Sequence, residues 1–275
     1  MRSKIIVLLI LIINLMLSAC SSTPKKESTE QELYEDAKRA IKIRSFQQAT
    51  IALEELESRF PFGKYAEQAQ LDLIYARYSS LDLEGSKLAS DRFIRLHPQS
   101  PSVDYAYYVR GIANYYLDGG VASQYFPSVD VSSRDPGHMR LSFKDFSELL
   151  MRFPESPYAA DAQQRMFDIR NRLAAYELHA ARYYIKRQAY LAAANRAAFV
   201  VKSFSASPST EEALNMMVSI YTKLGLKSQS EEALSVLKLN FPGGKSFNEQ
   251  GQYTAMHKLD PGRSLMSVVT FGLFD

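Results

Sequence analysis

Between residues 33 and 242 the apolar residues recur every three to four positions, and the alternation typical of strands is nearly absent. This period places them along one face of successive helices. Prolines interrupt the pattern after short motifs such as Arg59-Phe60-Pro61. Proline lacks an amide donor and clashes with the preceding turn, so each such motif marks the end of a helix. The pattern therefore predicts an all-α fold.

The helix-ending prolines themselves repeat, at intervals of 37, 56, 54 and 34 residues between Pro61, Pro98, Pro154, Pro208 and Pro242. A period near 34 residues is typical of tetratricopeptide (TPR) repeats, in which paired antiparallel helices stack into a superhelix. We predict a superhelical stack of five TPR helix pairs within residues 31–242. The repeats span residues 31–61, 64–98, 101–154, 156–208 and 210–242. A different helical repeat and a compact bundle are the alternatives.

Two of these units are longer than the standard repeat. The third contains residues 118–136, which are rich in Gly, Ser, Asp and Pro and predict a loop between its two helices. The fourth has no helix breaker from Ala159 to Lys186, which predicts a lengthened first helix. First helices of such repeats line a concave surface that binds segments of other proteins.

The N-terminus has the three regions of a signal peptide, here residues 1–19: a basic start, an apolar run over residues 5–17, and small residues. The run is shorter than the roughly 20 residues that cross a bilayer. The residues around its end, Leu17-Ser18-Ala19-Cys20, resemble the bacterial lipobox. This resemblance implies cleavage between Ala19 and Cys20, then lipidation of Cys20 with S-diacylglycerol and an N-acyl chain such as palmitate. A chance cysteine is the alternative.

The single cysteine of the chain excludes an internal disulfide, which agrees with a role in lipidation. Residues 20–30 are polar and predict a flexible tether. Ser21 stands where lipoproteins retained in the inner membrane carry Asp, so the resemblance implies the outer membrane, with the protein on its periplasmic face. Without residues 1–19 the chain has 31 basic and 30 acidic residues. This balance gives no argument for nucleic acid.

Catalytic or metal-binding motifs are not apparent. The four histidines, His97, His138, His179 and His257, are scattered, with no second His or Cys at metal-ligand spacing. The sequence has no glycine-rich phosphate loop and no nucleophile elbow. We therefore expect no enzyme activity, no metal and no cofactor.

The chain has 17 tyrosines and no tryptophan, and several tyrosines cluster between residues 75 and 116. Neighbouring helical positions diverge by about 100°. Of a consecutive pair such as Tyr107 and Tyr108, one must therefore leave the seam between helices. Packing explains most of them, and exposure to the concave groove is the alternative for the others.

Three stretches carry a closer resemblance: RFPFGKYAEQAQLDLIYARY at residues 59–78, DRFIRLHP at 91–98 and DYAYYVRG at 104–111. With the lipobox and the five repeats, they resemble the BamD family of TPR lipoproteins. This family belongs to the outer-membrane β-barrel assembly (BAM) complex. The resemblance implies a lipid-anchored scaffold that takes part in the assembly and insertion of β-barrel proteins. A TPR lipoprotein adaptor that organises cell-wall enzymes is the alternative.

The resemblance also implies the partners: BamA through its last POTRA domain, other BAM lipoproteins, and unfolded outer-membrane β-barrel substrates. An arginine of the C-terminal repeats is central to the BamA contact in the family, which makes Arg196, with its neighbour Asn195, the BamA-binding candidates. A solvated helix charge is the alternative for Arg196. The N-terminal repeats receive substrate in the family, and the candidates there are Tyr65, Tyr75 and Arg77.

Residues 243–275 extend past the last repeat. They begin with Gly243-Gly244 and end with an apolar stretch in which Val269, Phe271 and Leu273 alternate as in a short strand. A flexible tail is the simpler interpretation. The alternative is a segment that docks on a groove or on the sheet edge of a partner.

Overall fold

The computed structural model describes residues 28–125, 135–257 and 259. The described chain divides into two compact units, residues up to 69 and residues 70 onward. Described residues of the first unit form α2 (Glu30–Lys42), α3 (Phe46–Arg59) and the beginning of α4 (Ala66–Ser79). Thr29 caps α2, because its hydroxyl accepts from Glu32 N–H and the Glu32 carboxylate accepts from Thr29 N–H in return.

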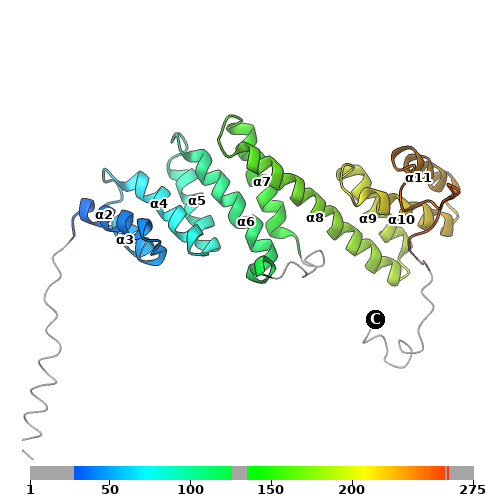
Figure 1. The fold of residues 1–275 in the computed structure, drawn as a ribbon, viewed down its shortest axis with the longest axis horizontal. Helices are drawn as coiled ribbons and strands as arrows, with labels where there is room; N and C mark the ends of the chain where they lie inside the picture. The colour runs from blue at the N-terminus through cyan, green and yellow to red at the C-terminus, as the bar shows by residue number, and fades with distance from the viewer. Residues whose placement is uncertain (1–27, 126–134, 258, 260–275) are drawn as a thin grey trace, which may run out of the picture. The chain divides into compact units, whose positions relative to one another are not determined.

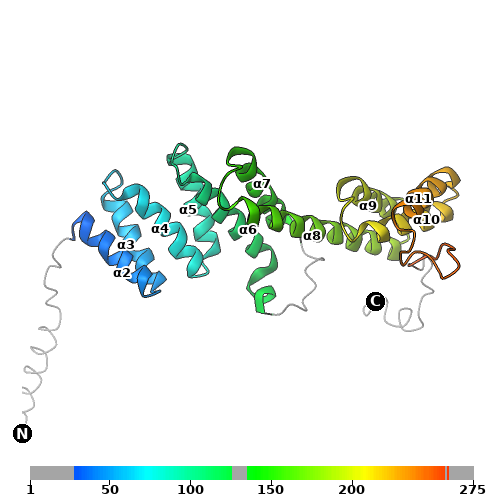
Figure 2. The same ribbon diagram turned by 45° about the horizontal axis from the view of Figure 1, so that its top comes forward.

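The second unit continues with seven helices after α4, each packed against the next along the chain (Figures 1 and 2). They are α5 (Leu83–Leu96), α6 (Val103–Tyr125), α7 (Gly137–Arg152), α8 (Ala159–Lys186), α9 (Tyr190–Ser203), α10 (Thr210–Lys223) and α11 (Lys227–Asn240). In the part of the chain that is described, β-structure is limited to one isolated bridge, between Phe247 and Tyr253. The prediction of an all-α repeat of helix pairs is confirmed, and each expected interval contains one helix pair.

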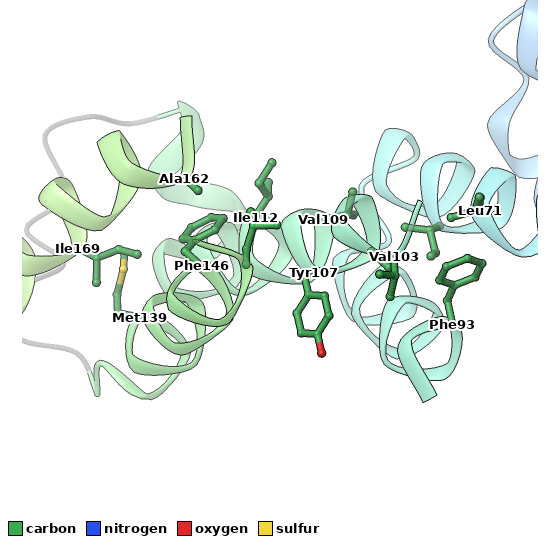
Figure 3. Close-up of a cluster of buried hydrophobic side chains, with 13 residues drawn as sticks. Leu71, Phe93, Val103, Tyr107, Val109, Ile112, Met139, Phe146, Ala162 and Ile169 are labelled. Carbon is green, nitrogen blue, oxygen red and sulfur yellow. The ribbon is translucent and has the colours of Figure 1, made fainter. Parts of the chain in front are cut away.

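The largest hydrophobic core lies where α4 to α7 and the first half of α8 meet. Figure 3 shows its side chains, with Phe146 of α7 between residues of α6 and α8. The most buried large side chains there include Phe93, Phe146 and Ile169, which are 0% exposed. Burying a side chain of this size stabilises a fold by about 1.5–3 kcal/mol. This core therefore holds the first helices of three repeats in register.

Helix α8 joins two cores. Its 28 residues are free of Pro and Gly, as the sequence predicts, and span about 42 Å at 1.5 Å per residue. Ala162 and Ile169 belong to the large core, whereas Ala174, Leu178 and Ala181 pack with α9 and α10 in a second, alanine-rich core. Small side chains let these helices approach closely. The long helix thus contributes buried side chains to the cores of both halves of the second unit.

The turn between the two helices of a pair uses a left-handed residue in four repeats. These residues are Arg44, Leu81, Gln188 and Gly225, with φ of 59°, 64°, 59° and 73°. The amides of these residues and the following ones bond back to the helix, as from Leu81 N–H to the Tyr78 carbonyl. Glycine fits this conformation without strain, whereas a residue with a Cβ pays about 1–2 kcal/mol. Three repeats accept that cost.

Two expectations from the sequence differ from the structure. The loop expected from Asp118 begins later, because α6 continues to Tyr125. The extension expected to be flexible from residue 243 is instead packed on α10 as far as residue 257, through bonds such as Asn215 Nδ2 to the Thr254 carbonyl. The lipobox with Cys20 and the stretch containing Val269, Phe271 and Leu273 lie outside the described residues, as do residues 126–134.

Candidate protein-binding surfaces

Half-buried tyrosines of α4, α6 and the start of α8 gather against the large core. We call them the aromatic face: Tyr78, Tyr105, Tyr108, Tyr115, Tyr116 and Tyr158. Tyr108 stacks on Tyr158 with ring centroids 4.5 Å apart. The consecutive pair diverges as predicted, since Tyr107 is 4% exposed in the core and the hydroxyl of Tyr108 reaches α8. The face is built from first helices of repeats, which is where TPR proteins bind ligands.

Two hydroxyls of this face are held by matching groups on α8. Tyr108 donates to Asp161 Oδ2 at 2.7 Å, and seven residues later Tyr115 donates to Asp168 Oδ2 at 2.5 Å. Each aspartate also pairs with an arginine four residues further on, namely Arg165 and Arg172. The spacing of seven is the same on both helices, so α6 and α8 run side by side with repeated contacts.

These contacts favour the protonated form of two tyrosines. Burial, together with the hydrogen bond to Asp161, raises the pKa of Tyr108 to about 12, and burial with the bond to Asp168 does the same for Tyr115. Arg165 lies 5.2 Å from the ring centroid of Tyr115 and 5.8 Å from that of Tyr116. The face therefore combines neutral aromatic rings with a cation, a chemistry suited to apolar and aromatic peptide side chains.

A hollow of about 490 Å³ opens beside this face, lined by Tyr78, Ser79, Leu81, Leu83 and Tyr116. Leu81 is 53% exposed and occupies the strained left-handed position of its turn. Backbone strain and an apolar side chain in water both disfavour the folded state, and such strain is often found at functional sites. Both features make this hollow a candidate docking point for an apolar side chain.

The candidates named from the family resemblance have different surroundings. Tyr65 belongs to the first unit, where its ring stacks on Tyr34 at 4.6 Å and its N–H donates to Glu30. Tyr75 and Arg77 belong to α4 in the second unit. Tyr75 is 42% exposed, whereas Arg77 donates to the Gly85 carbonyl at 3.0 Å and so ties α4 to α5. Tyr75 is thus accessible, and Arg77 has a structural contact.

Arg196 lies on α9 and pairs with a buried carboxylate. Its Nη1 donates to Oε2 of Glu177 on α8 at 2.9 Å, and Arg140 of α7 approaches the same carboxylate at 3.9 Å. The Glu177 side chain is 5% exposed and that of Arg196 is 44% exposed. The hydrogen bond to Glu177 raises the pKa of Arg196. The neighbouring Asn195 is exposed. Arg196 is therefore held by Glu177 while its side chain remains 44% exposed.

Glu177, Asp161 and Asp168 were not predicted from the sequence. For Glu177 the available signal was its place among the small and apolar residues of α8, where a carboxylate needs a cation to be buried. For Asp161 and Asp168 it was the pair of arginines four residues later, combined with tyrosines spaced by seven on α6. None of these signals identifies the partners on α6 and α9, because those contacts join different helices.

Two further properties concern the described residues alone. In residues 28–125, 135–257 and 259, no three or more His, Cys, Asp and Glu side chains are grouped as a metal ion would require. Within the same residues, no helix combines the length and apolar character needed to cross a membrane.

Comparison with known proteins identifies the family. Residues 26–237 match the family YfiO, described as outer membrane lipoprotein. The outer membrane protein assembly factor BamD of Vibrio cholerae is 38% identical over 227 residues, which cover 82% of this chain and 94% of the relative. BamD of Neisseria meningitidis is 38% identical over 86% of this chain and 91% of its own length. BamD of Xylella fastidiosa is 32% identical over 93% of this chain and 89% of its own length. The chain therefore belongs to the BamD (YfiO) family of outer membrane lipoproteins.

Proposed function

We propose that this chain is a lipid-anchored scaffold of the BAM complex that acts in the assembly and insertion of β-barrel proteins, without a catalytic step. The observation that carries the proposal is its membership of a family whose relatives are named as outer membrane protein assembly factors. Cys20 is the proposed lipid attachment site, because it follows the lipobox and is the single cysteine of the chain. Two acyl chains or more hold a protein firmly at a membrane, whereas one does not.

The proposed contact with the POTRA region of BamA uses Arg196, with Asn195 beside it. The bond to Glu177 orients the guanidinium, and the Arg196 side chain as a whole remains 44% exposed. A planar guanidinium can bond a second carboxylate with two parallel hydrogen bonds, which an ammonium group cannot do. Removing one partner of a desolvated charge pair costs 2 kcal/mol or more of binding, roughly thirtyfold in affinity. Arg196 would therefore contribute to the interface through its charge and through the fixed orientation of its guanidinium.

Capture of BamA from detergent-solubilised outer membranes tests this contact. We expect Arg196→Glu to lose most of the BamA that the wild-type chain recovers, and Arg196→Lys to lose part of it. Arg95→Glu, which makes the same charge change at an exposed arginine of α5, is the matched control and should recover BamA normally. Thermal unfolding of each variant checks the fold. Recovery of cell-wall synthases or hydrolases in place of BamA would overturn the proposal.

Glu177→Gln separates orientation from structure in the same assay. This variant keeps the Arg196 charge and removes the ion pair that fixes it. If Arg196 binds BamA, Glu177→Gln should weaken capture less than Arg196→Glu does. Equal losses with equal drops in thermal stability would mean that the pair acts only through the α8–α9 packing.

The proposed substrate contact is the aromatic face with its hollow, together with Tyr75. Unfolded barrel segments alternate apolar and polar side chains, and an apolar or aromatic side chain fits the hollow lined by Tyr78, Leu81 and Tyr116. Aromatic pairs contribute about 0.5–1.5 kcal/mol beyond the area that they bury. Tyr65 and Arg77 remain candidates from the resemblance, and Arg77 would act through its contact with Gly85.

A fluorescent peptide with the last strand of a barrel protein tests this contact. We expect Tyr116→Ala and Leu81→Ser to weaken its binding several-fold, since each removes a wall of the hollow. Tyr183→Ala is the control, because Tyr183 is an exposed tyrosine of α8 outside the aromatic face. Unchanged binding in both hollow variants would exclude this site, while leaving the BamA contact of Arg196 intact.

A further inference from the structure

The segment after the last repeat is folded onto α10. We call residues 244–257 and Leu259 the C-terminal strap, which is the reddish-brown segment that follows α11 in Figures 1 and 2. It forms a small hairpin, in which Thr254 N–H donates to the Ser246 carbonyl at 2.8 Å and Asn248 N–H to the Gln252 carbonyl at 2.9 Å. The second arm of this hairpin then follows α10 through Thr254 and Ala255, and it bends at Met256 and His257.

Asn215 of α10 binds the main chain of this arm with both the donor and the acceptor of its side-chain amide. Its Nδ2 donates to the Thr254 carbonyl at 2.9 Å, and its Oδ1 accepts from Met256 N–H at 2.9 Å. A carbonyl and the amide two residues later point to the same side of an extended chain, which is the geometry that strand pairing uses. Asn215 therefore recognises an extended backbone, whatever side chains that backbone carries.

Other groups of α10 recognise side chains and ends of the strap. The Tyr253 hydroxyl bonds to Ser219 Oγ at 2.5 Å and donates to the Asn215 carbonyl at 2.9 Å. Four residues later, His257 Nε2 lies 2.8 Å from Oε1 of Glu212. Glu211 accepts from both the N–H and the hydroxyl of Ser246, at 2.8 and 3.0 Å. Along the strap, these groups of α10 thus bind a small polar residue, then an aromatic hydroxyl and then a basic residue.

Helix α10 contains a buried polar residue that the covering of a terminal repeat does not require. A terminal repeat needs its apolar surface covered, and Phe247 and Tyr253 do this by packing on Leu214 and Val218. Asn215, however, is 1% exposed in the middle of a helix, where asparagine disfavours the helix and a buried amide is costly without partners. Its amide is satisfied by the main chain of the strap. This points to a site made for an extended polypeptide.

We propose that α10 carries a peptide-binding site, with Asn215 as its backbone clamp, and that the strap is its resident ligand and can be exchanged. The ligand class is an extended segment of a partner protein with an aromatic residue four positions before a basic one. A tethered segment acts at an effective concentration in the millimolar range, so the strap excludes weaker ligands. The site shares no residue with Arg196 or with the aromatic face, and it adds a third binding surface.

Displacement in the full chain tests this proposal. The opened variant carries Tyr253→Ala and His257→Ala, which weaken the strap without touching α10. The probe is a fluorescent synthetic peptide with residues 244–259 (GKSFNEQGQYTAMHKL), followed by anisotropy, and a scrambled peptide is the control. We expect the opened variant to bind the probe at least about tenfold more tightly than the wild-type chain does. Adding Asn215→Leu should then weaken binding by about tenfold or more, because leucine keeps the volume but loses both hydrogen bonds.

Two measurements make each outcome decisive. Circular dichroism shows whether Asn215→Leu remains folded, and hydrogen exchange reports whether the amides of residues 246–257 exchange faster in the opened variant. Faster exchange with probe binding that depends on Asn215 supports the site. If the strap amides keep their protection, if the opened variant does not bind the probe, or if it binds the scrambled peptide equally well, the strap is a fixed end cap and the proposal fails.

Discussion

A single methyl group at position 111 would show how tightly α6 and α7 are packed under the aromatic face. A Cβ on Gly111 would lie 2.6 Å from Cε1 and 2.8 Å from Cδ1 of Phe146. Carbon atoms in contact prefer about 3.5–4.0 Å. The ring of Phe146 is fully buried, and Ser142 of the same helix donates its hydroxyl to the Gly111 carbonyl at 2.8 Å. The neighbour therefore has little room to move.

Two opposing effects set the size of the change in Gly111→Ala. Alanine favours a helix over glycine by about 1 kcal/mol. Overpacking of a well-filled core costs about 1–3 kcal/mol, and loosening the bond from Ser142 adds to this cost. We expect a net loss of about 1–2 kcal/mol in the free energy of unfolding. For a unit of this size each kcal/mol lowers Tm by about 2–4 °C.

Urea unfolding followed by circular dichroism measures this change, with Phe146→Leu as the second arm of a double-mutant cycle. Removing the ring makes room for the added methyl group, so Gly111→Ala should cost less in the Phe146→Leu background. A stability equal to or above wild type would refute the steric argument, because helix propensity would then dominate. The same cost in both backgrounds would show that Phe146 is not the obstacle.

Three further outcomes follow from single contacts. Leu81→Gly should raise the free energy of unfolding by about 0.5–1 kcal/mol, because relief of left-handed strain exceeds the entropy of the added glycine; thermal unfolding measures it, and a loss would contradict the strain. Tyr108→Phe should cost about 1–2 kcal/mol in urea unfolding, and almost nothing once Asp161→Ala is present. Burial raises the pKa of Glu212, but His257 and Arg182 outweigh it and leave it below its ordinary 4.5. The ionised carboxylate therefore contributes its full share of the free energy of unfolding above about pH 4.5, and this share is lost as the pH falls through the lowered pKa. Acid unfolding of Glu212→Gln should lack this loss.

Local sequence rules predicted most of the helices. Four second helices end two residues before a proline, as α5 ends at Leu96 ahead of Pro98, because proline excludes the helical conformation of the residue before it. The absence of breakers likewise predicted the length of α8. The same rules placed the end of α6 too early, at Asp118, since glycines weaken a helix but do not stop one.

The sequence by itself therefore determined the number, order and period of the helices, and the family to which the chain belongs. Tertiary structure decided the contacts between distant positions: Arg196 with Glu177, the tyrosines of α6 with the aspartates of α8, and the strap on Asn215. Helix formation depends on neighbours three and four residues away, which the sequence displays directly. A hydrogen bond between residues 19 to 53 positions apart depends on how two helices pack, and that is set by the whole core.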